Sequence, residues 1–166
     1  MFRRVADFEK TWHEEREGTL KLFGALDDRS LAQAAGADQR TLGRIAWHLT
    51  TTLGEMMDRT GLKVEGPAHD SAVPAEAAMI VAAYDAASQS VARQVGGWTD
   101  ADLEVEDEMY GERWPRGRTL QALVAHQAHH RGQMTVLMRL AGLKVPGVYG
   151  PSREEWAAYG MPAPAV

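Results

Sequence analysis

Two histidines stand four residues apart in a segment whose spacing of apolar residues indicates a core-facing helix. His126 and His130 belong to the run His-Gln-Ala-His-His-Arg-Gly-Gln, which ends at Gln133. Because residues four apart on a helix lie one above the other on one face, the two imidazoles can chelate a single metal ion. His48, in an earlier segment of helical spacing, is the obvious third donor. Three neutral imidazoles leave zinc or nickel an open coordination position for water or substrate.

The angular positions of the histidines favour a shared site. At about 100° per residue, His130 falls within the apolar stripe of its helix and His126 lies about 40° from it. His129 points off the stripe by roughly a quarter turn, so we expect it at the surface, at an interface or behind a ligand. His48 lies at the edge of the stripe on the earlier helix. Border positions on two helices can together form a solvent-accessible site.

The alternative is that these histidines only pack. A single histidine on an apolar face is usually a hydrogen-bonded core residue. A pair four residues apart is harder to explain in this way. Each buried imidazole needs a hydrogen-bond partner, and burial makes protonation of either ring unfavourable. Glu55 lies nearly two turns beyond His48 on the same side of its helix. It is a weaker candidate, as a fourth ligand, a hydrogen-bond acceptor, a catalytic base or simply a solvated carboxylate. His13 and His69 receive no assignment.

Two further residues of the run have structural interpretations. Arg131 follows a candidate ligand and is expected to form a salt bridge or to hold a neighbouring loop. Gln133 can fix the tautomer of a ligand histidine by hydrogen bonding to its other ring nitrogen.

Apolar spacing predicts four helices, and therefore an all-α fold and an antiparallel four-helix bundle, a fold that builds metal sites on facing helices. Asp38 is expected to cap the second helix and Ser71–Pro74 to open the third. The chain length favours one domain over residues 1–166. The predicted helices cover about residues 2–26, 38–59, 71–95 and 119–140.

The connection 98–118 is too long for a simple turn in a compact bundle. Leu103–Glu106 alternates like a short strand, and the connection is expected to fold over one end of the bundle and shape a pocket. In the tail, Ser152 is expected to cap a short C-terminal helix, and aromatic residues are expected to pack back on the bundle. The sequence leaves open whether the pocket is lined by Tyr110, Trp114, Arg116 and Arg118.

Composition excludes several classes of protein and of site. The 18 basic and 23 acidic residues give a net charge of −5, which argues against a nucleic-acid partner. The chain has no cysteine, so any metal site uses histidine or carboxylate ligands and any reacting thiol must come from outside. No segment is apolar for long enough to span a bilayer, and Met1–Val5 lacks the apolar core of a signal peptide. We expect a cytoplasmic protein with a small-molecule substrate and no membrane partner.

The run 126–133, Trp47-His48-Leu49 and the tail 145–156 together resemble the DinB/YfiT-like superfamily, which is distinct from the translesion polymerase of the same name. The resemblance implies an up-down-down-up four-helix bundle, usually a homodimer, with a divalent metal held by three histidines. Carried over to this chain, the metal ligands are His48, His126 and His130. The superfamily often has asparagine before the first histidine of the last helix, where this chain has Ala125.

Three functions are compatible with such a site. The metal can turn a low-molecular-weight thiol into a thiolate for S-transfer, and superfamily members include transferases and an isomerase that use bacillithiol, mycothiol or similar thiols. A metal-dependent hydrolase would instead activate water against an ester or amide, with Glu55 as the one visible base. The third function is a non-enzymatic, stress-related metal-binding module. The resemblance ranks thiol transfer first, and an open coordination position separates catalytic from structural metal.

Overall fold

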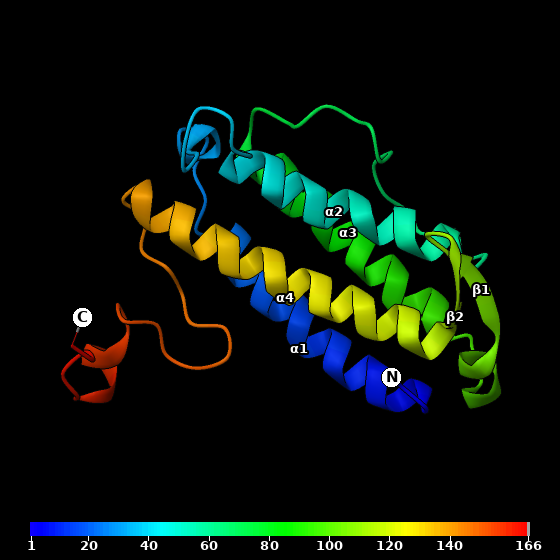
Figure 1. The fold of residues 1–166 in the computed structure, drawn as a ribbon. Helices are drawn as coiled ribbons and strands as arrows, with labels where there is room; N and C mark the ends of the chain where they lie inside the picture. The colour runs from blue at the N-terminus through cyan, green and yellow to red at the C-terminus, as the bar shows by residue number, and fades with distance from the viewer. Residues whose placement is uncertain (166) are drawn as a thin grey trace.

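Four long helices and one small sheet make up the computed structural model, which describes residues 1–165 (Figure 1). The helices are α1 (Val5–Phe23), α2 (Leu42–Asp58), α3 (Ala77–Val95) and α4 (Arg116–Leu140). The strands are β1 (Glu106–Met109) and β2 (Glu112–Pro115), and single turns of 3₁₀ helix form η1 (Ser30–Ala32), η2 (Asp100–Glu104) and η3 (Trp156–Tyr159). The four predicted helices and a mostly helical fold are confirmed, and the small antiparallel sheet β1–β2 is an addition that the all-α prediction did not include.

The four helices lie side by side, with α2 and α3 running one way and α1 and α4 the other (Figure 1). Helices α1 and α2 each contact both α3 and α4. The segment 59–76 returns along α2 to the start of α3, and the Trp47 indole N–H donates to the Ser71 carbonyl across 3.1 Å. Within residues 1–165, no helix is both long and apolar enough to cross a lipid bilayer.

Apolar side chains from all four helices form one core. Each fully buried large apolar side chain contributes about 1.5–3 kcal/mol relative to an exposed one. The largest of these side chains include Phe8, Trp12, Leu49, Leu53, Ile80, Tyr84 and Met109.

A buried polar bridge fixes α4 against α2 beside the candidate ligands. The Gln127 amide, fully buried, donates to the Leu49 carbonyl across 3.1 Å. Its oxygen accepts a hydrogen bond of 3.2 Å from the Tyr84 hydroxyl on α3. Since Gln127 follows His126 and Leu49 follows His48, the Gln127–Leu49 bond fixes the position of His126 along α4 relative to His48 on α2.

Two of the predicted helix starts are wrong, because other groups provide the caps. Helix α2 begins at Leu42, where the Thr41 hydroxyl, and not Asp38, accepts from the Arg44 N–H at 3.1 Å. Helix α3 begins later than Ser71–Pro74 because the Ala77 N–H donates to the Asp28 carboxylate across 2.8 Å. A side chain so distant in sequence cannot be recognised from local pattern.

The connection between α3 and α4 folds as a hairpin over one end of the helices, as predicted (Figure 1). Its predicted strand at Leu103–Glu106 is misplaced, because a reciprocal cap between Thr99 and Asp102 starts the helical turn η2 there. Strand β1 begins at Glu106 and turns at Tyr110 and Gly111, whose φ values are 55° and 86°. Positive φ at both positions suits the tight turn of a two-residue hairpin.

The tail returns to the bundle as predicted, but through valines and not through the expected aromatic residues, since Tyr149 and Tyr159 are 71% and 64% exposed. Val145 is buried, and Val148 lies so close to Gly18 that a Cβ there would be 2.6 Å from the valine Cγ1. The C-terminal helix is the single turn η3, and Ser152 does not cap it. Instead the Ser152 N–H donates to the Glu155 carboxylate across 2.9 Å.

Candidate metal centre

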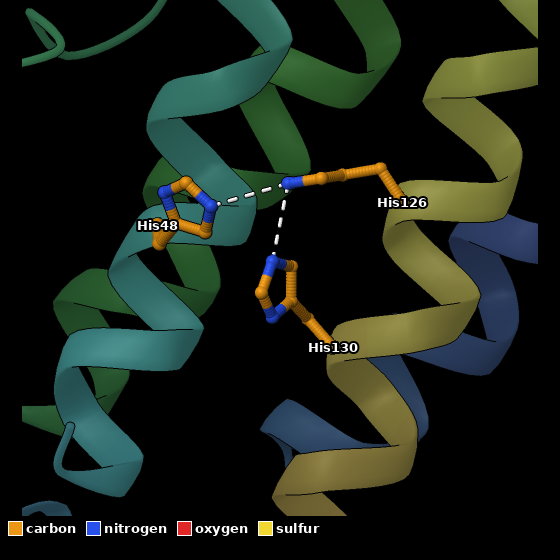
Figure 2. Close-up of side chains that lie close together, drawn as sticks. All are labelled: His48, His126 and His130. Carbon is orange, nitrogen blue, oxygen red and sulfur yellow. Dashed lines mark hydrogen bonds between the residues drawn. The ribbon is translucent and has the colours of Figure 1, made fainter. Parts of the chain in front are cut away.

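Three histidine rings from two helices meet at one point (Figure 2). His48 comes from α2, while His126 and His130 come from successive turns of α4. The Nε2 atom of His126 lies 3.1 Å from Nε2 of His48 and 3.1 Å from Nε2 of His130. One ligand atom from each ring lies within 4.8 Å of the other two. The structure therefore brings the three predicted ligands together, with His130 only 7% exposed and the other two half-buried.

These spacings suit a divalent transition metal. Nitrogens bound to zinc at about 2.05 Å lie about 3.3 Å apart at a tetrahedral angle and about 2.9 Å apart at a right angle. The two measured separations of 3.1 Å fall between these values. Without an ion, three imidazole nitrogens facing one another have only ring N–H groups to share. The donor set therefore fits a metal better than it fits a packing role.

The environment keeps the rings neutral, which is the form that binds a metal. Burial, reinforced by the neighbouring histidines, lowers the pKa of His48 to about 4. Burial also lowers the pKa of His126 to about 4, and it lowers the pKa of His130 below its ordinary value. All three imidazoles are thus uncharged at neutral pH.

One ligand is oriented by a side chain of its own helix. His130 Nδ1 lies 2.7 Å from the Gln133 side-chain oxygen, which can only accept, so Nδ1 carries the proton and Nε2 keeps its lone pair. His126 has no such support within residues 1–165, since its buried Nδ1 lacks a hydrogen-bond partner. The preceding residue is Ala125, which has no side-chain acceptor to offer.

Replacing Gln133 with leucine should weaken zinc binding by about 10–100-fold, the usual effect of losing a residue that orients a ligand. Because Gln133 is exposed, the substitution should leave the folded structure intact. Competition with a chromophoric chelator measures the change. Gln121→Leu, also exposed on α4, is the matched control, and equal affinities for the two variants would contradict the orienting role.

Two pockets flank the histidines. The first, about 430 Å³, contains His48 and His126 and has hairpin residues on its wall. The second, about 560 Å³, contains His130. The 98–118 connection therefore shapes a pocket, as predicted, through Tyr110 and Trp114. Arg116 and Arg118 are not among its lining residues. The remaining residues of the first pocket are Thr52, Glu55, Met56, His69 and Ala122.

Comparison with known proteins is consistent with this architecture. A model of the DinB family matches residues 1–164. The chain belongs to the DinB family. It is 44% identical over 167 residues to the uncharacterized protein YrdA of Bacillus subtilis (strain 168), with full coverage of both chains. The crystal structure of a DinB-like protein from Bacillus cereus is similar, with a TM-score of 0.82 and 42% identity, covering 90% of this chain and all of that one. The DinB-like protein YjoA of Bacillus subtilis shares the fold, with a TM-score of 0.68 and 15% identity over 86% of this chain and 97% of that one.

In this DinB-family chain, Glu55 lies beside the three histidines without joining their donor group. Its carboxylate accepts a hydrogen bond of 2.8 Å from the Tyr110 hydroxyl and pairs with Arg59 at 3.1 Å. Among residues 1–165, the group of converging donor atoms consists of the three histidines without Glu55, so the structure provides no support for Glu55 as a fourth ligand. Its place in the pocket keeps it a candidate base.

Two pocket residues were not identified by sequence reasoning. His69 lines the first pocket and Arg40 the second. Both lie in irregular segments before a helix, where the spacing of apolar residues carries no signal. No local pattern in the sequence identifies either residue.

Arg131 anchors α4 to α1 and to the tail, which confirms the predicted salt bridge and tie. Its guanidinium pairs with the Glu15 carboxylate, and it donates to the Glu15 carbonyl at 2.6 Å and to the Thr19 hydroxyl at 2.9 Å. The Tyr149 hydroxyl joins both charged groups. The residue after His130 is therefore held against α1, on a different face of α4 from the metal centre, which limits rotation of the helix.

Proposed function

We propose that this protein holds a divalent ion, zinc or nickel, through His48, His126 and His130 and activates a low-molecular-weight thiol for S-transfer. The observation that carries the proposal is the convergence of three neutral Nε2 atoms between two open pockets. A bound divalent ion supplies the acidity, because it deprotonates a coordinating thiol at neutral pH. The absence of cysteine means that this thiol comes from a second molecule.

The two pockets allow two small molecules to reach the same centre from different sides. Met56, Tyr110 and Trp114 give the first pocket an apolar and aromatic wall, which suits an apolar acceptor. In the transfer, the thiol loses its proton to solvent and the sulfur bonds to an electrophilic carbon of the acceptor. The leaving group departs with the electrons of its former bond to that carbon.

Cobalt substitution tests the proposal. Protein freed of metal and reloaded should take up close to one cobalt ion per chain, and adding a simple thiol such as 2-mercaptoethanol should produce a sulfur-to-cobalt absorption band. His48→Ala should lose both the cobalt and the band, because it removes the only ligand from α2. Absence of metal from the wild-type protein would reject the site. Cobalt binding without a thiol band would reject thiol activation.

One observation favours hydrolysis as a second candidate function. Glu55 shares the first pocket with His48 and His126, where a carboxylate can act as base toward water. Metal-dependent cleavage of p-nitrophenyl acetate that Glu55→Gln abolishes, with no thiol band, would favour this function over S-transfer. Metal binding with neither activity would favour a non-enzymatic module.

The up-down-down-up bundle and the homodimer belong to the same proposal. The parallel course of α2 and α3 against α1 and α4 supports the bundle (Figure 1). Sedimentation velocity that returned only the 18.2 kDa chain mass would reject the dimer.

A further inference from the structure

The pocket beside His130 differs in chemistry from the pocket beside His48. Its wall is formed by the loop before α2, the first turn of α2 and the last turns of α4. With a volume of about 560 Å³, it has the size of a site for a small organic ligand. We call it the Arg40 pocket. It is lined by Ala35, Asp38, Gln39, Arg40, Ile45, His130, Gln133, Val136 and Leu137.

Arg40 is an exposed cation that has no acidic partner among residues 1–165. It takes part in none of the ion pairs found in the described part of the chain, and Asp38 on the same wall is not paired with it. Arg40 and His130 line the same pocket, so the guanidinium lies on the wall that leads to the metal centre. An anion in this pocket would meet this guanidinium and any ion held by the histidines.

The pocket on the other side has a carboxylate and no arginine or lysine among its lining residues. Glu55 lines it, so its polar wall carries a carboxylate, although Arg59 and Tyr110 partly satisfy that group. Of the two pockets, the one with an unpaired guanidinium is therefore the better place for an anionic group. Ile45 and Leu137 supply apolar surface for the carbon chain that bears it.

We propose that the Arg40 pocket binds the carboxylate end of the small thiol, with Arg40 as the residue that selects it. This inference rests on the proposed function, since it assigns one of the two flanking pockets to the thiol and leaves the other to the acceptor. A guanidinium recognises a carboxylate through two parallel N–H donors, and the same fork would reject an uncharged amide in its place.

A pair of thiols that differ only at the carboxylate tests the assignment. Zinc-loaded protein is titrated with N-acetylcysteine and with N-acetylcysteinamide, and the methyl NMR signals of the pocket residues report both affinity and location. The acid should bind about tenfold more tightly than the amide, the effect expected of one charge-assisted contact. Its addition should shift the signals of Ile45, Val136 and Leu137.

Three variants isolate the contribution of the guanidinium. Arg40→Gln should bind the two thiols equally, whereas Arg40→Lys should retain part of the preference for the acid. Arg153→Gln, which removes an exposed arginine of the tail, should behave as the wild-type protein. Equal affinities in the wild-type protein, a preference that survives in Arg40→Gln, or shifts confined to Met56 and Ala122 of the other pocket would each overturn the assignment.

The metal requirement separates this inference from the proposed function. Equal, zinc-dependent binding of both thiols would overturn the Arg40 pocket and leave thiol activation standing. A preference for the acid that is the same without zinc would support the pocket as an anion site and count against thiol activation. No binding of either thiol would overturn both.

Discussion

Replacing His126 or His130 with alanine is expected to abolish stoichiometric binding of a divalent ion, whereas His129→Ala should leave it nearly intact. The Nε2 atom of His126 lies 3.1 Å from the Nε2 atoms of both His48 and His130, and removing His126 or His130 leaves two nitrogen donors for the ion. We expect an affinity loss above the roughly 100-fold upper range for residues that only orient a ligand. Metal content after equilibrium dialysis measures the effect.

His129→Ala is the matched control, because it removes the same side chain from the same helix at an exposed position. His129 hydrogen bonds to the Gln133 amide nitrogen, at 3.2 Å, while the amide oxygen accepts from His130. Its ring also packs edge-on against the ring of His130, with the centroids 4.9 Å apart. We therefore expect His129→Ala to change the affinity for the metal ion only slightly, through its effect on Gln133. Equal loss of metal in all three variants would show that the angular argument is wrong.

Arg131→Ala should destabilise the protein by about 3–5 kcal/mol, because it leaves the Glu15 carboxylate buried without its cation. The two side chains are 3% and 9% exposed, and the pair joins α4 to α1. Arg139→Ala breaks the pair with Glu154, whose members are 44% and 27% exposed, and should cost about 0–1 kcal/mol. Urea unfolding of the metal-free proteins followed by circular dichroism compares the two.

A double variant keeps this prediction testable if Arg131→Ala does not fold. Glu15→Leu with Arg131→Met removes both charges and fills the space with apolar atoms, and such replacements are often neutral or stabilising. The double variant should unfold at a urea concentration near that of the wild-type protein. If Arg131→Ala and Arg139→Ala lose equal stability, the buried pair does not have the role assigned to it.

Local pattern predicts the helices better than their ends. The spacing of apolar residues marks all four helices because each buries one face, and that spacing repeats every turn. The starts of α2 and α3 were misplaced because their first N–H groups bond to Thr41 and to Asp28. Asp28 lies before α2 in the chain, so this contact exists only after α3 has packed. The hairpin was anticipated as a fold over the helix ends, but its strands were not placed.

The sequence by itself determined which histidines share a face. The spacing of His126 and His130 is a local property of one helix, and so is the exposed direction of His129. Only the tertiary structure decided that His48 meets this pair, with its Nε2 atom 3.1 Å from that of His126, because the buried Gln127–Leu49 bond fixes the position of α4 along α2. The tertiary structure also decided that the Glu55 carboxylate accepts a hydrogen bond from Tyr110 and pairs with Arg59.

The pockets were likewise decided by tertiary structure. Arg40 and Tyr110 come from irregular segments, where no periodic pattern limits the direction of a side chain. Helical periodicity relates residues up to a few turns apart, whereas a pocket wall combines side chains from segments whose distance depends on packing of the whole chain. For this reason the histidine ligands could be proposed from their spacing in the sequence. The residues that line the two pockets beside them could not.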